Sequence, residues 1–170
     1  MGPRHSAPLH AAEEPPTFAA AEHEPSWRGA MHEELDSIVD NSTWELVELP
    51  PGHRAIGLKW VYKVKRDENG NIVCHKARLI AKGYVQRASV DFDEVFSPIA
   101  RMESVRLMLA LAAHQGWEVH HMDVKSMFLN GELKEEVYIA QPPGFVFNGA
   151  EHKVLRLHKA LYGLKQTPRA

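Results

Sequence analysis

Positive side chains gather in one stretch of this 170-residue chain, between Gly57 and Lys82. Seven fixed cations stand there against two carboxylates: Lys59, Lys63, Lys65, Arg66, Lys76, Arg78 and Lys82 against Asp67 and Glu68. Arginine grips a phosphate through two parallel hydrogen bonds, whereas lysine acts as a point charge. Because the whole chain carries a formal net charge of -2, any site for nucleic-acid phosphates must be local. The alternative is a solvated strand face whose lysines discourage edge-to-edge aggregation.

A second candidate for chemistry is Asp123, near the end of a buried strand predicted from Trp117 to Val124. A carboxylate at a strand end suits Mg²⁺, a hard cation that prefers oxygen ligands, and phosphoryl transfer needs such a metal. The alternative is an aspartate that caps a turn by accepting hydrogen bonds from backbone N–H groups. His120 and His121 precede it, but neighbours on a strand point to opposite faces, so we do not expect them to share a metal ion.

The element that positions the cations is predicted to be a β-hairpin. Apolar and polar residues alternate from Leu58 to Lys65 and again from Ile72 to Lys82, which is the period of a half-buried strand. Asn69–Gly70 between them is a strong hairpin signal. Alternation puts the cations on one face and an apolar set on the other: Leu58, Trp60, Tyr62, Val64, Val73, Ala77, Leu79 and Ala81. We therefore expect Trp60 and Tyr62 to pack in the core rather than stack on bases.

The other segments predict a mixed α+β fold. A helix should begin at Ser26 and end near Asn41, and a second should run from Glu103 to Gln115 before Gly116. We also expect extended segments at 44–49, 136–140 and 153–158 and a turn or short helix at 126–133. Residues 1–25, rich in Pro, Ala, Glu and His, are interpreted as a disordered tail.

Composition limits the remaining classes of protein. A single cysteine, Cys74, excludes an intrachain disulfide and a cysteine-rich zinc site, and it fits an intracellular compartment, either cytoplasmic or nuclear. The longest apolar run, Leu107 to Ala113, is far shorter than the roughly 20 residues needed to cross a bilayer, so no membrane partner is expected. Neither a secretory signal nor a transit peptide is recognisable in the first residues.

Several long motifs follow one another along the chain. They are NSTWELV at 41–47, GLKWVYK at 57–63, KARLIAKG at 76–83, FSPIAR at 96–101, MDVKSMFLNG at 122–131 and LYGLKQTPRA at 161–170. In this order they resemble a copia-type LTR retrotransposon reverse transcriptase, the RNA-directed DNA polymerase domain of a Pol polyprotein. The resemblance is nearly continuous from about residue 25 to residue 170. It implies part of a right-hand polymerase fold, with a fingers hairpin within residues 44–100 and an incomplete ferredoxin-like palm within residues 101–170.

The resemblance also implies roles for individual residues. Arg78 and Lys63 would contact the nucleotide or its template from the fingers, and Asp123 would be the first Mg²⁺ ligand of the palm. Phe128 stands where an aromatic ring blocks a ribose 2′-hydroxyl, and Lys165 lies in a segment that supports the nucleotide. The implied partners are an RNA or DNA template–primer and deoxynucleotides. Two Mg²⁺ ions would assist attack of a primer 3′-hydroxyl on the α-phosphate.

The chain departs from the family pattern in three places. The family's paired aspartates on a later hairpin are absent from these 170 residues, and we expect Asp123 alone to hold the metals too poorly for catalysis. Without that hairpin we also expect an exposed sheet edge and apolar surface. Met127 and Ser89 stand where a small residue and a glycine are usual. We therefore expect an inactive, truncated fragment; the alternatives are a non-catalytic nucleic-acid-binding module and a pseudogene product, and the oligomeric state stays open.

Overall fold

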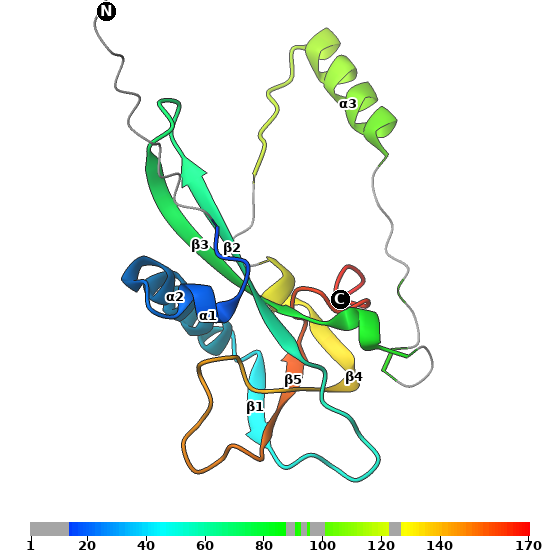
Figure 1. The fold of residues 1–170 in the computed structure, drawn as a ribbon. Helices are drawn as coiled ribbons and strands as arrows, with labels where there is room; N and C mark the ends of the chain where they lie inside the picture. Colours follow the sequence, from blue (N-terminus) through cyan, green and yellow to red (C-terminus); the bar gives the residue numbers. More distant parts are fainter. Residues whose placement is uncertain (1–13, 88–90, 93–94, 96–100, 123–126) are drawn as a thin grey trace, which may run out of the picture.

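The structure of the chain is a computed structural model that describes residues 14–87, 91–92, 95, 101–122 and 127–170. Its elements follow in the order α1 Phe18–Ala21, α2 Pro25–Asp40, β1 Trp44–Val47, β2 Leu58–Arg66, β3 Ile72–Ala81, η1 Gly83–Val85, α3 Met102–Gln115, η2 Met127–Asn130, β4 Glu132–Ile139 and β5 Val154–Lys159. η1 and η2 are single turns of 3-10 helix. Helices and strands therefore mix along the chain, as the α+β prediction requires (Figure 1).

The β2–β3 hairpin carries the cations. Its antiparallel register places Trp60 opposite Leu79 and Lys63 opposite Lys76. The predicted inward face is confirmed over most of its length, because these residues are buried: Leu58, Trp60, Tyr62, Ala77, Leu79 and Ala81. Val73, also predicted to point inward, is 62% exposed. The register shifts between Lys65 and Arg66, so Val73 is the extra residue of a bulge and has no direct partner across the hairpin.

Helix α2 packs against the inward face of this hairpin. Pro25 stands at the start of the helix, where its fixed backbone angle fits and its missing N–H has no intrahelical partner to lose. Trp27 is 1% exposed, and its ring meets the Tyr62 ring edge-on with centroids 5.2 Å apart. Tyr62 donates its hydroxyl proton to the Met31 sulfur at 3.4 Å. Burial of this phenol raises the pKa of Tyr62 to about 12, so it stays protonated.

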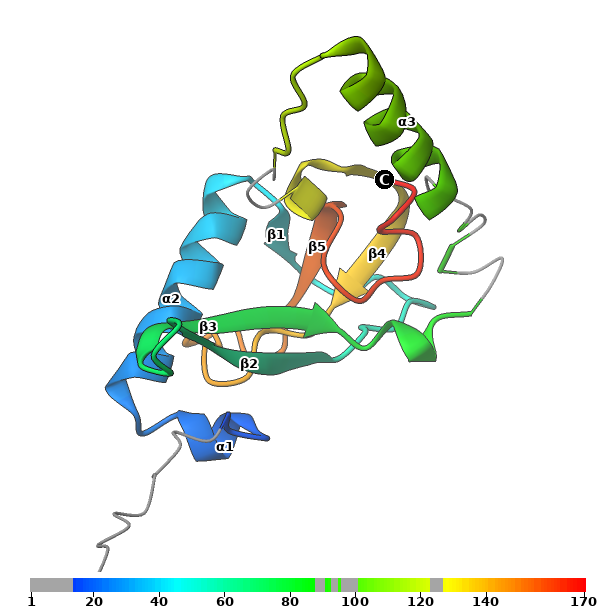
Figure 2. The ribbon, with the colours of Figure 1, turned by 90° about the horizontal axis from the view of Figure 1, so that it is seen from above.

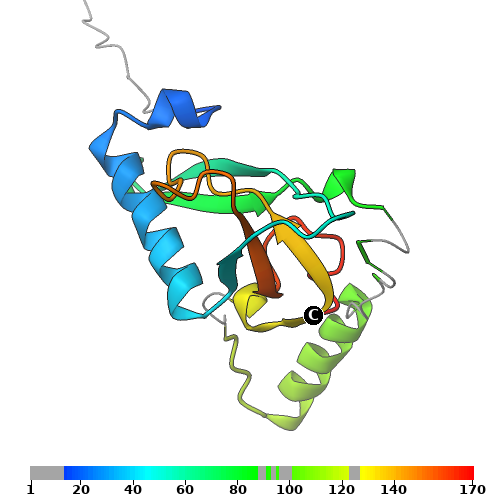
Figure 3. The same cartoon turned by 90° about the horizontal axis from the view of Figure 1, so that it is seen from below.

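A second sheet has the strand order β1-β5-β4, and both pairings are antiparallel. Its inward side chains join those of α2 and the hairpin in one hydrophobic core. Ile56, just before β2, forms a bridge with Ile139 and donates its N–H to the Tyr138 carbonyl at 2.8 Å. Figure 3 shows α2 running beside both the hairpin and this sheet. The core therefore fixes the hairpin relative to the rest of the chain.

Residues 160–170 return to the end of β3. The Ala81 N–H donates to the Tyr162 carbonyl at 2.7 Å. Gly163 follows with a φ of +92°, and a Cβ at this position would lie 2.2 Å from the Ala81 carbonyl oxygen. Only glycine combines this backbone conformation with so close an approach. Tyr162 is thus positioned by a hydrogen bond to its own carbonyl and by the close approach of the next residue to β3.

Helix α3 forms where it is predicted, but its apolar side chains are exposed. Gly116 ends the helix in the left-handed conformation with a φ of 69°. Ala112 is the buried residue of the helix, whereas Leu107 is 70% and Met108 68% exposed. Figures 1 and 2 show α3 standing outside the body formed by α2 and the two sheets. Among the described residues, no helix is long and apolar enough to span a bilayer.

The buried strand predicted from Trp117 to Val124 is not present in its described part. Residues 117–122 have no strand structure, and Trp117 and Met122 are 59% and 83% exposed. A strand needs pairing and packing partners, and none of the described strands pairs with this segment. Val124 and Asp123 lie outside the described residues.

The segment predicted as a tail contains packed structure in its second half. Thr17 caps α1 by accepting a hydrogen bond from the Ala20 N–H at 3.3 Å, and Ala21 is fully buried. The Phe18 ring lies where a side chain on Gly144 would be. Pro15 and Pro16 precede this short helix and do not interrupt it, so the tail interpretation does not hold for residues 17–25. Residues 1–13 lie outside the described range.

Candidate nucleic-acid interface

The outward face of the hairpin carries five aligned cations. They are Lys59, Lys63 and Lys65 on β2 and Lys76 and Arg78 on β3. Lys63 and Lys76 are direct partners across the hairpin, an arrangement of like charges that destabilises a sheet. An anion held over this face would relieve their repulsion and gain attraction from several cations at once. The face therefore suits a ligand with more than one phosphate.

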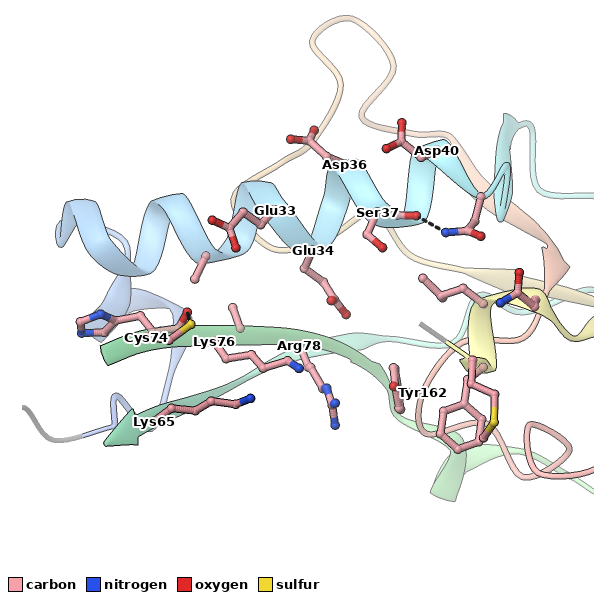
Figure 4. A pocket seen from close by; sticks show the side chains of 18 residues that line it. Glu33, Glu34, Asp36, Ser37, Asp40, Lys65, Cys74, Lys76, Arg78 and Tyr162 are labelled. Carbon is pink, nitrogen blue, oxygen red and sulfur yellow. Dashed lines mark hydrogen bonds between the residues drawn. The ribbon is translucent and has the colours of Figure 1, made fainter. Parts of the chain in front are cut away.

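A groove of about 1080 Å³ lies between α2 and the free edge of β3. Figure 4 shows the two walls facing each other, with carboxylates on the helix and cations on the strand. The helix wall contributes Glu33, Glu34, Asp36 and Asp40, and the strand wall contributes Lys65, Cys74, Lys76 and Arg78. Tyr162 and the η2 residues 127–130 line the groove further along. The groove thus has one acidic wall, one basic wall and aromatic rings.

Two of the predicted nucleotide-binding residues come together in this groove. The Arg78 guanidinium carbon lies 4.7 Å from the centre of the Tyr162 ring. The Phe128 ring meets the same tyrosine with centroids 4.9 Å apart and planes at 66°. Arg78 and Phe128 come from distant parts of the sequence, and Tyr162 lies in contact with both. Sequence reasoning gave Tyr162 no role, although its place in the motif at 161–170 was a signal.

Glu34 on α2 forms a hydrogen bond with the free edge of β3. Its Oε1 accepts a hydrogen bond from the Leu79 N–H at 3.3 Å, so a backbone donor on the free edge is satisfied by a side chain. Burial raises the pKa of the Glu34 carboxyl above its ordinary value, and the Leu79 N–H, Arg78 and Lys76 oppose that rise. Glu34 thus anchors α2 to the strand that bears Arg78.

Lys165 lies apart from the groove. Its backbone N–H donates to the Gln86 side chain at 2.9 Å, and its Nζ donates to the Gln86 carbonyl at 3.4 Å. The same ammonium lies 5.0 Å from the centre of the Phe92 ring. Gln86 also donates to the buried Gln166 side chain at 3.1 Å. The structure therefore joins the Lys165 segment to the chain after β3, and it does not bring Lys165 beside Arg78 and Phe128 in the groove lining.

Lys63 is also outside the groove lining and has a partner from the N-terminal segment. Its Nζ lies 2.6 Å from Glu14 Oε2, and the other oxygen of Glu14 accepts the Val64 N–H at 3.1 Å. Lys63 remains 69% exposed at the side chain. No sequence pattern predicted this contact, since Glu14 was assigned to the tail.

The predicted metal ligand Asp123 lies outside the described residues. Within the described ranges, no group of three or more His, Cys, Asp or Glu side chains is placed to hold a metal ion. The carboxylates of the groove are spread along one wall of α2 and do not converge (Figure 4). Groups placed to hold Mg²⁺ are therefore not found within the described residues, and the metal role of Asp123 stays a prediction.

A cationic hairpin face beside a groove lined by aromatic rings is typical of proteins that bind phosphate-bearing ligands. A family model described as reverse transcriptase (RNA-dependent DNA polymerase) matches residues 41–170. The chain belongs to this reverse transcriptase family, which confirms the resemblance seen in the sequence motifs. No solved structure matches the chain significantly.

Several similar proteins are Pol polyproteins of transposons. The chain is 51% identical over 140 residues to the retrovirus-related Pol polyprotein from transposon TNT 1-94 of Nicotiana tabacum, which covers 82% of the chain and 10% of that protein. It is 43% identical over 163 residues to the retrovirus-related Pol polyprotein from transposon RE1 of Arabidopsis thaliana. This match covers 95% of the chain and 11% of that protein. The transposon Ty1-BL Gag-Pol polyprotein of Saccharomyces cerevisiae is 31% identical over 144 residues, and this match covers 81% of the chain and 8% of that protein. The chain thus spans about a tenth of the length of these relatives.

Proposed function

We propose that these residues form the fingers and the beginning of the palm of an RNA-directed DNA polymerase and bind its template–primer and incoming deoxynucleotide. The observation that carries this proposal is the grouping of Arg78, Tyr162 and Phe128 in one groove below the cationic hairpin face. The groove volume of about 1080 Å³ is sufficient for a small-molecule ligand of nucleotide size. In this reading the fingers lie within residues 44–100 and the palm begins within residues 101–170.

We propose a role for each of the four predicted nucleotide-binding residues. Arg78 is exposed at the groove with a donor fork that suits the triphosphate. The Phe128 ring, held against Tyr162, forms an apolar wall that disfavours a ribose 2′-hydroxyl, because a buried hydroxyl without a partner is costly. Lys63 faces the backbone of the template–primer, and Lys165 supports the groove indirectly through Gln86.

The chemistry of the family is attack of a primer 3′-hydroxyl on an α-phosphate. Mg²⁺, when bound by Asp123 together with further carboxylates, would supply charge neutralisation for that step. The residues described here bind and orient the substrates. Because the paired-aspartate motif does not occur within residues 1–170, we expect this chain by itself to bind template–primer without extending it.

Fluorescence anisotropy with a labelled RNA/DNA template–primer tests the binding. Affinity should fall as salt rises, with a log–log slope of about -0.9 for each phosphate contacted. Arg78→Ala and Lys63→Ala should each weaken binding and make the slope shallower by about one contact. Lys134→Ala, a cation on β4 away from the hairpin, is the matched control and should change neither. Phosphate binding by this face would be contradicted if the affinity did not depend on salt, or if it were unchanged when Arg78→Ala and Lys63→Ala are combined.

A primer-extension assay with Mg²⁺ tests the second part of the proposal. We expect no extension by the 170-residue chain. Extension that disappears in Asp123→Asn would show that the chain catalyses without the paired aspartates, and the inactivity proposal would then be wrong.

A further inference from the structure

The N-terminal segment brings a carboxylate to the edge of β2, where it is bound by two donors. Glu14 Oε2 lies 2.6 Å from Lys63 Nζ, and Glu14 Oε1 accepts the Val64 N–H at 3.1 Å. One ammonium and one backbone N–H thus converge on the two oxygens of a single anion. A phosphodiester presents two equivalent oxygens to its surroundings in a similar way. The donors that bind the carboxylate are therefore suited to a phosphate.

We propose that Lys63 Nζ and the Val64 N–H form a phosphate-binding subsite, and that Glu14 occupies this subsite until the phosphate of a nucleic acid displaces it. The inference rests on the proposed function, since the phosphate would belong to the template–primer held by the hairpin. It adds to that function a defined position on the β2 edge and a competitor supplied by the chain itself.

The charges around the subsite favour an anion whether it comes from Glu14 or from a nucleic acid. Lys63 is paired directly with Lys76 across the hairpin, and Arg66 lies further along the same strand. The hydrogen bond from Lys63 and then the one from the Val64 N–H lower the pKa of Glu14, with smaller contributions from the charges of Lys63 and Arg66. Glu14 is therefore ionised at neutral pH and neutralises part of the positive face.

The chain next to Glu14 is anchored, so the carboxylate stays near its site when it is displaced. Thr17 caps α1, the Phe18 ring lies over Gly144 and Ala21 is fully buried. A tethered group competes at a high effective concentration. Yet Lys63 is 69% and Glu14 37% exposed at the side chain, and exposed ion pairs of this kind are weak. A nucleic acid that makes several phosphate contacts should therefore replace Glu14, with a modest loss of affinity.

The experiment compares Glu14→Gln with Glu68→Gln in the full 170-residue chain. Both substitutions remove one negative charge, but Glu68 lies in the turn of the hairpin and not at the subsite. With a labelled RNA/DNA duplex, Glu14→Gln should raise the affinity about two- to fivefold at low salt, the range that a weak exposed ion pair permits. The log–log salt slope should change little, because the Lys63 phosphate contact forms in both chains once Glu14 is displaced. Glu68→Gln should give a smaller gain in affinity than Glu14→Gln.

Two further measurements make the outcome specific. In Lys63→Ala, the gain from Glu14→Gln should disappear, because the subsite no longer exists. In the unsubstituted chain, addition of the duplex should shift the Val64 amide resonance in an NMR spectrum, which needs no variant to fold. Glu14→Gln and Glu68→Gln behaving alike, together with an unmoved Val64 amide, would overturn the subsite while salt-dependent binding persists. Absence of duplex binding by every variant would instead overturn the proposed function and the subsite with it.

Discussion

The hairpin with α2 and the segment from α3 to residue 122 both carry apolar sequence patterns, but their surroundings differ. Trp27, Tyr62 and Leu79 are at most 3% exposed, and each contacts side chains from another element. Leu107 and Met108 are more than two-thirds exposed. The sequence predicts a helix and strand structure in both regions. What separates them is the presence of a partner surface within the described residues.

This difference shows how far a local pattern determines a structure. The hairpin satisfies its own backbone hydrogen bonds, and α2 supplies the apolar surface it needs, so the pattern and the tertiary structure agree. Helix α3 satisfies its backbone internally and forms without packing. A helix that is apolar on several sides is usually buried, so the composition of α3 is typical of a core helix. Residues 117–122 would need a neighbouring strand to satisfy their backbone hydrogen bonds, and they have no strand structure.

The largest contrast is expected from truncating one side chain in each region. Trp27→Ala should lower the free energy of unfolding by about 3–5 kcal/mol, because it removes a buried ring and leaves a cavity between α2 and the hairpin. Leu107→Ala should change it by no more than about 0.5 kcal/mol, since the side chain is exposed. Urea denaturation followed by far-UV circular dichroism measures both. Equal effects would mean that the two regions do not differ in packing as described.

A second contrast uses two glycines. Gly163→Ala places a Cβ 2.2 Å from the Ala81 carbonyl oxygen at a φ of +92°, and such backbone strain is worth about 1–3 kcal/mol before the clash is counted. Gly29→Ala in α2 meets no atom within 4 Å and should stabilise the helix by about 0.5–1 kcal/mol. In thermal unfolding, Gly163→Ala should lower the Tm and Gly29→Ala should raise it. A neutral Gly163→Ala would show that the 160–170 segment does not pack at the end of β3.

The smallest effect concerns the link between α2 and β3. Glu34 has a folded-state pKa above its ordinary value of 4.5, so its ionised form weakens the folded state; this loss is complete above the folded-state pKa and disappears as pH falls toward 4.5. Glu34→Gln keeps an oxygen for the Leu79 N–H and removes the charge. The variant should be slightly more stable than the parent at pH 7, with a difference that narrows toward pH 4.5. Glu33→Gln, exposed on the same helix, is the control for removal of one charge from α2.

Local signals in the sequence predicted the secondary structure well where partners are near in the chain. The alternation around Trp60 and the Asn69–Gly70 turn predicted the hairpin, and the helical spacing from Trp27 predicted α2 within one residue of its observed start. The strand from Trp117 failed because an apolar run reports burial only when a pairing strand exists. Val73 failed because a bulge shifts the two-residue period.

The candidate site was predictable only in part. The motif resemblance identified Arg78 and Phe128, and the structure places both against Tyr162. It could not show that Lys165 is held by Gln86, or that Glu14 reaches Lys63, because both contacts join segments about 50 to 80 residues apart without a pattern in either. The role of Asp123 stays a prediction.

Cys74 offers a practical handle on this molecule. It is the sole cysteine of the chain, it is exposed, and it lies on the same wall of the groove as Lys76 and Arg78 (Figure 4). A maleimide fluorophore would therefore attach at one defined point without any engineering of the sequence. Its emission would report occupancy of the groove, and spin labels at the same thiol would report distances to a labelled template.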